Sequence, residues 1–176
     1  MVLCPLSSVL CPLSSESEEM AGKITASKEK LMPDARYNSL LASKFINCLM
    51  WQGKKATAVR IFYGAMDAIK KRMPDVNPID VFTTAVEFVK PPVELRSRRV
   101  GGATYQVPMQ VSPSRKQSLA FRWIINAARG KTGKAMFQRL ADELMAAYRK
   151  EGEAMAKRET TIKMADANKA FAHFAW

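Results

Sequence analysis

The sequence predicts a mainly α-helical domain, a bundle of about six helices with one protruding two-stranded β-hairpin. Apolar residues recur at helical spacing through most of residues 38–173, and this period is broken once, around Gly101-Gly102. Hydrophobic residues make up 48% of the 176 positions, so the chain has enough apolar surface for a core. Two strands alone cannot bury a core, so we expect the hairpin to be an appendage on a helical body.

The first 37 residues are expected to precede that body. The heptapeptide VLCPLSS occurs twice, at 2–8 and 9–15, and two copies are too few to build a repeat fold. We interpret residues 1–19 as a disordered or untranslated extension and predict Met20 as the start. Residues 20–37 have the composition of a basic N-terminal arm. Its cationic residues are Lys23, Lys28, Lys30 and Arg36.

Three helices are predicted before the hairpin. The first is expected from an Asn38 N-cap to about residue 52, with Gly53 as its stop and Cys48 as a small core residue on its apolar face. The second runs from residue 54 or 55 to about 73. The third follows Asn77-Pro78, an N-cap with proline at the first helical position, and ends before residues 91–92, both prolines.

The hairpin and three further helices follow. Residues 93–100 and 103–111 are rich in types that favour strands, and the glycine pair between them suits a tight turn with positive φ. With a two-residue turn, Arg98 faces Tyr105 across the ribbon, and both share one face with Arg96 and Val107. Helices are then expected over about 114–128, 132–150 and 159–173, so the folded domain spans 38–176.

Charge indicates a polyanionic partner. Lysine and arginine total 28 against 16 acidic residues, a net charge of +12, which favours nucleic acid first and an anionic membrane surface second. No run of 18 apolar residues predicts a membrane span. The basic residues stand at the ends of elements and on the hairpin rather than along one amphipathic face, which favours phosphate contacts over a membrane surface. The predicted contacts in the basic arm are Lys23, Lys28, Lys30 and Arg36. The predicted contacts in the folded domain are Lys54, Lys55, Arg96, Arg98, Arg99, Arg115, Lys116, Arg122 and Arg129, with Tyr105 for stacking.

Catalytic and metal-binding patterns are missing from the sequence. His173 is the only histidine, and the three cysteines lack metal-ligand spacing, so we expect no catalytic triad, no metal and no cofactor. Gly130-Lys131-Thr132 has Ile125 where a phosphate-binding loop needs its first glycine, so we interpret it as a turn between helices. Asp142-Glu143 has the pattern of a solvated helix surface. The chain is therefore not expected to be an enzyme.

Four separated motifs resemble bacterial small-subunit ribosomal protein seven. They are the hairpin sequence RSRRVGGATYQVP at 96–108, FIN at 45–47 followed by GKK at 53–55, SLAFRW at 118–123, and the C-terminal segment from Glu159 to Phe174. They occur in the family's order, and the resemblance covers about residues 31–176. One departure is the ending Phe174-Ala175-Trp176, where the family usually has arginine at the middle position.

The resemblance implies a fold of six helices with an extended hairpin. It implies primary binding to the 3′ major domain of small-subunit ribosomal RNA, nucleation of head assembly, and a place near exit-site tRNA and small-subunit ribosomal proteins nine and eleven. The protein is then expected in the small subunit of the cytoplasmic ribosome, with an organellar ribosome left open. The alternative is a DNA-architectural protein with a β-arm, but the tip Gly101-Gly102 lacks the apolar wedge that such arms insert.

Overall fold

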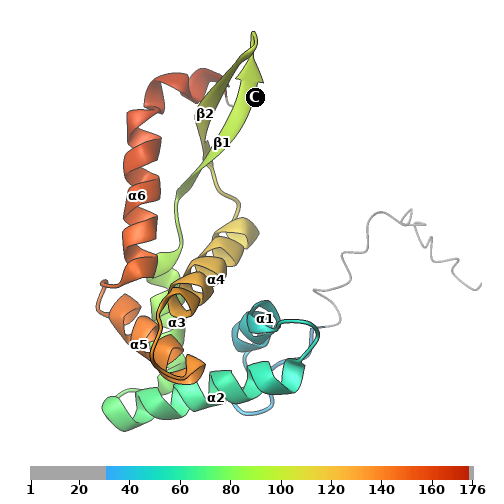
Figure 1. Cartoon of the computed structure of the whole chain (residues 1–176), viewed down its shortest axis with the longest axis vertical. Coiled ribbons are helices and arrows are strands. Elements are labelled where there is room, and N and C mark those ends of the chain that lie inside the picture. Colours follow the sequence, from blue (N-terminus) through green and yellow to red (C-terminus); the bar gives the residue numbers. More distant parts are fainter. Residues whose placement is uncertain (1–30, 175–176) are drawn as a thin grey trace, which may run out of the picture. The chain divides into compact units, whose positions relative to one another are not determined.

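The computed structural model describes residues 31–174, and these form a mostly helical unit with one antiparallel hairpin, as the sequence predicts (Figure 1). The interpretation of residues 1–19 and the predicted contacts Lys23, Lys28 and Lys30 lie outside the described residues. The elements in chain order are α1 (Leu40–Leu49), α2 (Lys55–Arg72), α3 (Pro78–Val89), β1 (Val93–Val100), β2 (Ala103–Gln110), α4 (Pro113–Gly130), α5 (Met136–Tyr148), α6 (Glu153–Ala167) and the 3-10 helix η1 (Lys169–Phe174).

The core is centred on four phenylalanines, one from each of the first four helices. The ring of Phe45 in α1 lies 5.9 Å from that of Phe62, 5.1 Å from Phe82 and 5.3 Å from Phe121, centroid to centroid. The pairs with Phe82 and Phe121 are edge-to-face and the pair with Phe62 is tilted. Aromatic pairs contribute about 0.5–1.5 kcal/mol each beyond the area they bury. Helix α5 closes the cluster with fully buried side chains such as Leu144. Packing against α1, α3 and α5 therefore fixes the position of α4, which carries much of the basic surface.

The ends of α1 differ from the prediction. Ser39 is the N-cap, and its side chain accepts a hydrogen bond from the Ala42 N–H, whereas Asn38 lies one residue earlier with φ +48°. The helix ends at Leu49, and Gly53 belongs to the following turn with φ +73°. Cys48 is exposed, so its prediction as a core residue is wrong. The buried face of α1 is formed by Ala42, Ser43, Phe45, Ile46 and Leu49 instead.

The last two helices also begin elsewhere. Helix α5 starts at Met136 rather than 132, and α6 starts at Glu153 rather than 159, before η1 continues the chain. The start of α6 depends on Glu143, which is fully buried and accepts a hydrogen bond from the Ala154 N–H at 2.9 Å. Glu143 also pairs with Lys131, so its interpretation as solvated surface is wrong. Residues 131–135 form the loop between α4 and α5, so Lys131 and Thr132 lie in an interhelix turn as predicted, whereas Gly130 is the last residue of α4.

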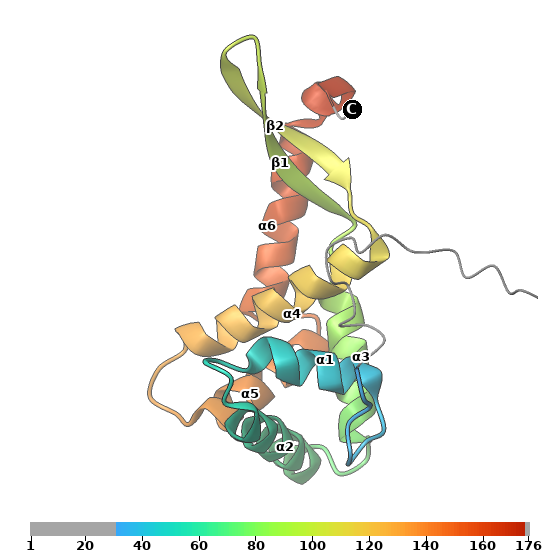
Figure 2. The same ribbon diagram turned by 90° about the vertical axis from the view of Figure 1, so that its right-hand side faces the viewer.

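The predicted register of the hairpin is confirmed. Arg98 faces Tyr105 and Val100 faces Ala103, and both turn glycines have positive φ, +59° at Gly101 and +90° at Gly102. The ribbon packs against α6 and, nearer the tip, against η1, and the tip itself projects beyond them (Figures 1 and 2). Val107 is fully buried there, although it lies outside the helical core cluster.

No helix within residues 31–174 has both the length and the apolar character that crossing a membrane requires.

Candidate nucleic-acid interface

A stripe of exposed polar residues runs along α4. Arg115, Arg122 and Arg129 recur every seven residues, which is close to two helical turns, so they lie on the same side of the helix. Ser118 and Asn126 fill the intervening positions, and all five residues are exposed. Successive arginines are therefore about 10 Å apart along the axis, at 1.5 Å of rise per residue.

A buried carboxylate holds the first of these arginines beside the hairpin. Glu94 of β1 accepts a hydrogen bond from Arg96 Nε at 2.8 Å and another from Arg115 Nε at 3.1 Å. Burial raises the pKa of Glu94, but the two guanidinium groups outweigh it, and the net pKa lies below the ordinary value. Glu94 thus positions two cations at the junction of hairpin and α4. It was not among the predicted site residues, although it is an acidic residue just ahead of three closely spaced arginines.

The other end of the stripe meets the turn between α1 and α2. Arg129 Nη2 donates to the Leu49 carbonyl at 3.2 Å, and its guanidinium lies 5.3 Å from the centre of the Trp51 ring. A cation at the last carbonyls of a helix is favourable, so Arg129 also stabilises the end of α1. Lys54 and Lys55 follow at the start of α2, as predicted, and both are exposed.

The midpoint of the stripe faces α1. Desolvation raises the pKa of the Cys48 thiol, and the nearby Arg122 guanidinium opposes that shift.

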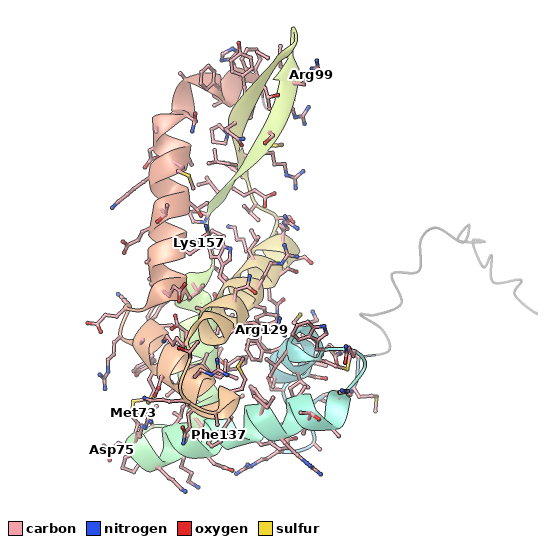
Figure 3. All side chains as sticks on the ribbon, in the orientation of Figure 1. Met73, Asp75, Arg99, Arg129, Phe137 and Lys157 are labelled. Atoms are coloured by element: carbon pink, nitrogen blue, oxygen red, sulfur yellow. The ribbon has the colours of Figure 1, made fainter. Side chains whose placement is uncertain are left out.

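The remaining predicted residues differ in how they are held. Arg36 pairs with Asp67 at 2.6 Å and lies over the rings of Tyr37 and Tyr63, so this end of the basic arm is packed on α2. The Tyr105 ring, predicted for stacking, lies 5.1 Å from the Phe171 ring and 5.6 Å from the Phe174 ring of η1. Within residues 31–174, no salt bridge to another described residue holds Lys54, Lys55, Arg99, Lys116 or Arg122. Figure 3 shows Arg99 beside the tip of the hairpin.

Two long segments without acidic residues explain why this surface is positively charged. No Asp or Glu occurs between Asp34 and Asp67, or between Glu94 and Asp142. The first interval contains α1 and the start of α2, and the second contains most of the hairpin and all of α4. Because α1 packs against α4, the fold brings the two acid-free segments together. We call the surface formed by the hairpin, the α4 stripe and the α1–α2 turn the basic face. Like charges gathered in this way favour a phosphate backbone.

Comparison with known proteins agrees with this chemistry. The family described as Ribosomal protein S7p/S5e matches residues 21–169. A relative from Rhodopirellula baltica, named Small ribosomal subunit protein uS7, is 60% identical over 156 residues, covering 88% of this chain and 99% of the relative. Relatives of the same name are 52% identical in Desulfotalea psychrophila, covering 89% of this chain and all of the relative, and 52% identical in Thermotoga neapolitana, covering 86% and 97%. The chain therefore belongs to the ribosomal protein S7p/S5e family.

Proposed function

We propose that the chain is a structural constituent of the small ribosomal subunit and binds its RNA directly through the basic face. In this proposal it is a primary binder of the 3′ major domain that nucleates assembly of the head, next to exit-site tRNA and to small-subunit proteins nine and eleven. Membership of a family of structural ribosomal proteins, with relatives named for the small subunit, supports the role. The basic face supports the direct contact with RNA.

The α4 stripe is the observation that carries the proposal. Three exposed arginines about 10 Å apart meet successive phosphates rather than one small anion, and arginine's planar fork binds phosphate oxygens bidentately. If about six phosphates are neutralised across the basic face, affinity falls about a thousandfold between about 50 and 200 mM salt.

The test is the affinity of the full chain for a transcript of the 3′ major domain, measured across a salt series. Arg122→Ala is expected to weaken binding and to reduce the slope of log affinity against log salt by about one, the effect of losing one phosphate contact. Lys163→Ala is the matched control, because Lys163 is an exposed cation on α6. Figures 1 and 2 show α6 and α1 on opposite sides of α4. Equal loss in both variants, or a nearly flat salt dependence, contradicts the proposed interface.

Competition with duplex DNA separates this function from a DNA-architectural role. The exposed tip Gly101-Gly102 has no apolar side chain to insert into a base step, so duplex DNA should compete weakly. Stronger binding to duplex DNA than to the RNA transcript would overturn the assignment to the ribosome.

A further inference from the structure

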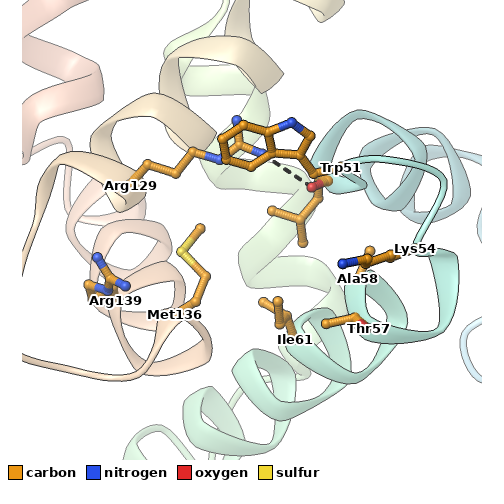
Figure 4. Close-up of a pocket in the computed structure, with 9 residues that line it drawn as sticks. Trp51, Lys54, Thr57, Ala58, Ile61, Arg129, Met136 and Arg139 are labelled. Carbon is orange, nitrogen blue, oxygen red and sulfur yellow. Dashed lines mark hydrogen bonds between the residues drawn. The ribbon is translucent and has the colours of Figure 1, made fainter.

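A pocket of about 540 Å³ opens at the end of the basic face, beside the α1–α2 turn. Its apolar lining includes Trp51, Ala58 and Ile61 from the α1–α2 region and Met136 from the start of α5. Figure 4 shows the Trp51 indole on one side of the opening and Ile61 on the other. The volume lies within the roughly 300–1,000 Å³ typical of ligand pockets. Trp51 is 72% exposed, so a large aromatic residue remains largely unburied at this site.

Three cations complete the lining of this pocket. Lys54, Arg129 and Arg139 contribute to it, and no acidic side chain does. Arg139 donates from Nη1 to the Lys131 carbonyl, but its Nε is buried and has no hydrogen-bond partner. A buried donor without an acceptor is costly, so the lining contains an unsatisfied polar group. An apolar cavity with an exposed aromatic ring and surrounding positive charge matches a flat ring attached to phosphate.

We propose that this pocket receives one unstacked nucleobase of the RNA strand bound by the basic face. The inference rests on the proposed function and identifies how one part of that interface reads RNA. Base–indole stacking needs only the π-face, so the site accepts an unpaired base from a loop, bulge or junction rather than a duplex. Lys54 and Arg129, which both line the pocket, meet the flanking phosphates.

The position of the pocket favours a nucleobase over an apolar side chain of a partner protein. Arg129 belongs both to the pocket and to the α4 stripe, so a strand following the arginines of α4 arrives at the opening. An apolar partner residue would leave the three cations desolvated without a counter-charge, which is unfavourable. A nucleotide brings its own negative charge to the same place.

Trp51→Ala tests the proposal in the full chain, with the transcript of the 3′ major domain as the probe. Loss of one base–aromatic stack should weaken binding about five- to one-hundredfold. Trp51→Phe, which keeps an aromatic ring, should recover most of the affinity. The salt slope of Trp51→Ala should match that of the parent chain, because no phosphate contact is removed. Leu40→Ala is the control, since Leu40 is also a largely exposed apolar residue, at the opposite end of α1.

The outcomes separate this inference from the proposed function. If Trp51→Ala binds as tightly as the parent while Arg122→Ala is weakened, the nucleobase site is wrong and the RNA interface stands. If Trp51→Ala reduces the salt slope as Arg122→Ala does, the indole acts by positioning Arg129, and the nucleobase site is overturned. If Trp51→Phe loses as much affinity as Trp51→Ala, stacking is excluded. If RNA affinity is unchanged but assembly into subunits fails, the occupant is a protein and the proposal is wrong.

Discussion

Replacing Glu143 with alanine should loosen α6 while leaving the phenylalanine core in place. The Glu143 carboxylate is fully buried beneath the α5–α6 turn. One of its oxygens accepts the Ala154 N–H at 2.9 Å, and the other pairs with Lys131. Ala154 is the second residue of α6, so a side chain of α5 performs the task that an N-cap residue usually performs within its own helix.

The size of the effect follows from these contacts. Loss of a helix cap costs about 0.5–2 kcal/mol. Loss of a charge-assisted hydrogen bond costs about 1.5–3 kcal/mol when buried, and less here because the Lys131 side chain is 37% exposed and can be hydrated. Removal of a buried carboxylate also relieves its desolvation, which offsets part of the loss. We therefore expect Glu143→Ala to lower the free energy of unfolding by about 2–4 kcal/mol, which is about 5–15 °C in Tm for a chain of this size.

Thermal unfolding and amide hydrogen exchange provide the measurement. Glu143→Gln is the matched variant, because its amide oxygen can still accept the Ala154 N–H while the charge is lost, and it should be destabilised by about half as much. Exchange should accelerate in the first turn of α6 in the alanine variant more than in α2 or α3. Equal stability of the alanine variant and the parent, or uniform loss of protection across all helices, would refute the capping role.

Three further predictions concern the glycine before α6, the buried carboxylate of the hairpin, and the hairpin itself. Gly152→Ala should cost about 1–3 kcal/mol, because φ is +97° and the added Cβ would lie 3.0 Å from Glu143 Oε1; Gly130→Ala, whose Cβ meets nothing closer than 3.9 Å, should be neutral or stabilising in the same melts. Burial alone would raise the pKa of Glu94, but its two arginine partners lower it below the ordinary value. The ion pairs of Glu94 therefore stabilise the fold fully at pH values above the ordinary glutamate pKa of about 4.3. This stabilisation is lost as the pH falls through the lowered pKa. Glu94→Gln should therefore be less stable than the parent at neutral pH, with a gap that closes in acid; a gap independent of pH contradicts this linkage. Deleting residues 97–106 should leave the helical body folded, because the buried residues of the core cluster come from the helices. The deletion should weaken RNA binding modestly and should reduce tRNA retention by assembled subunits more strongly. Unfolding of the body would show that the hairpin is not an appendage.

Local pattern was sufficient for the class of fold and for the hairpin. Apolar residues at helical spacing mark the side of each helix that faces the core, and this spacing predicted the helices α1 to α5 in their order along the chain. The hairpin register depends on a two-residue turn, and Gly101-Gly102 supplied the positive φ that such a turn needs. The excess of basic residues is a property of composition, so the polyanionic partner could be inferred before any contact was known.

Errors occurred where a distant residue decides the local structure. Helix α6 has a weakly apolar face, with Met164 41% exposed, so periodicity could not locate its start. That start depends on Glu143, ten residues earlier than Glu153, and a buried carboxylate and a solvated one look alike in sequence. Cys48 lies among apolar neighbours, yet the rotation of α1 against the core leaves it outside.

Sequence by itself determined the helical class, the hairpin and its register, and the positive charge, because each depends on residues that are adjacent or regularly spaced in the chain. Only the tertiary structure decided which cations contact distant residues of the protein. Arg36 meets Asp67, and Arg129 meets the end of α1, through contacts 31 and 80 residues apart. The pocket beside Trp51 likewise exists only because α1, α2, α4 and α5 converge there. Charge and periodicity are properties of the chain, whereas burial and pairing depend on the packing of distant segments.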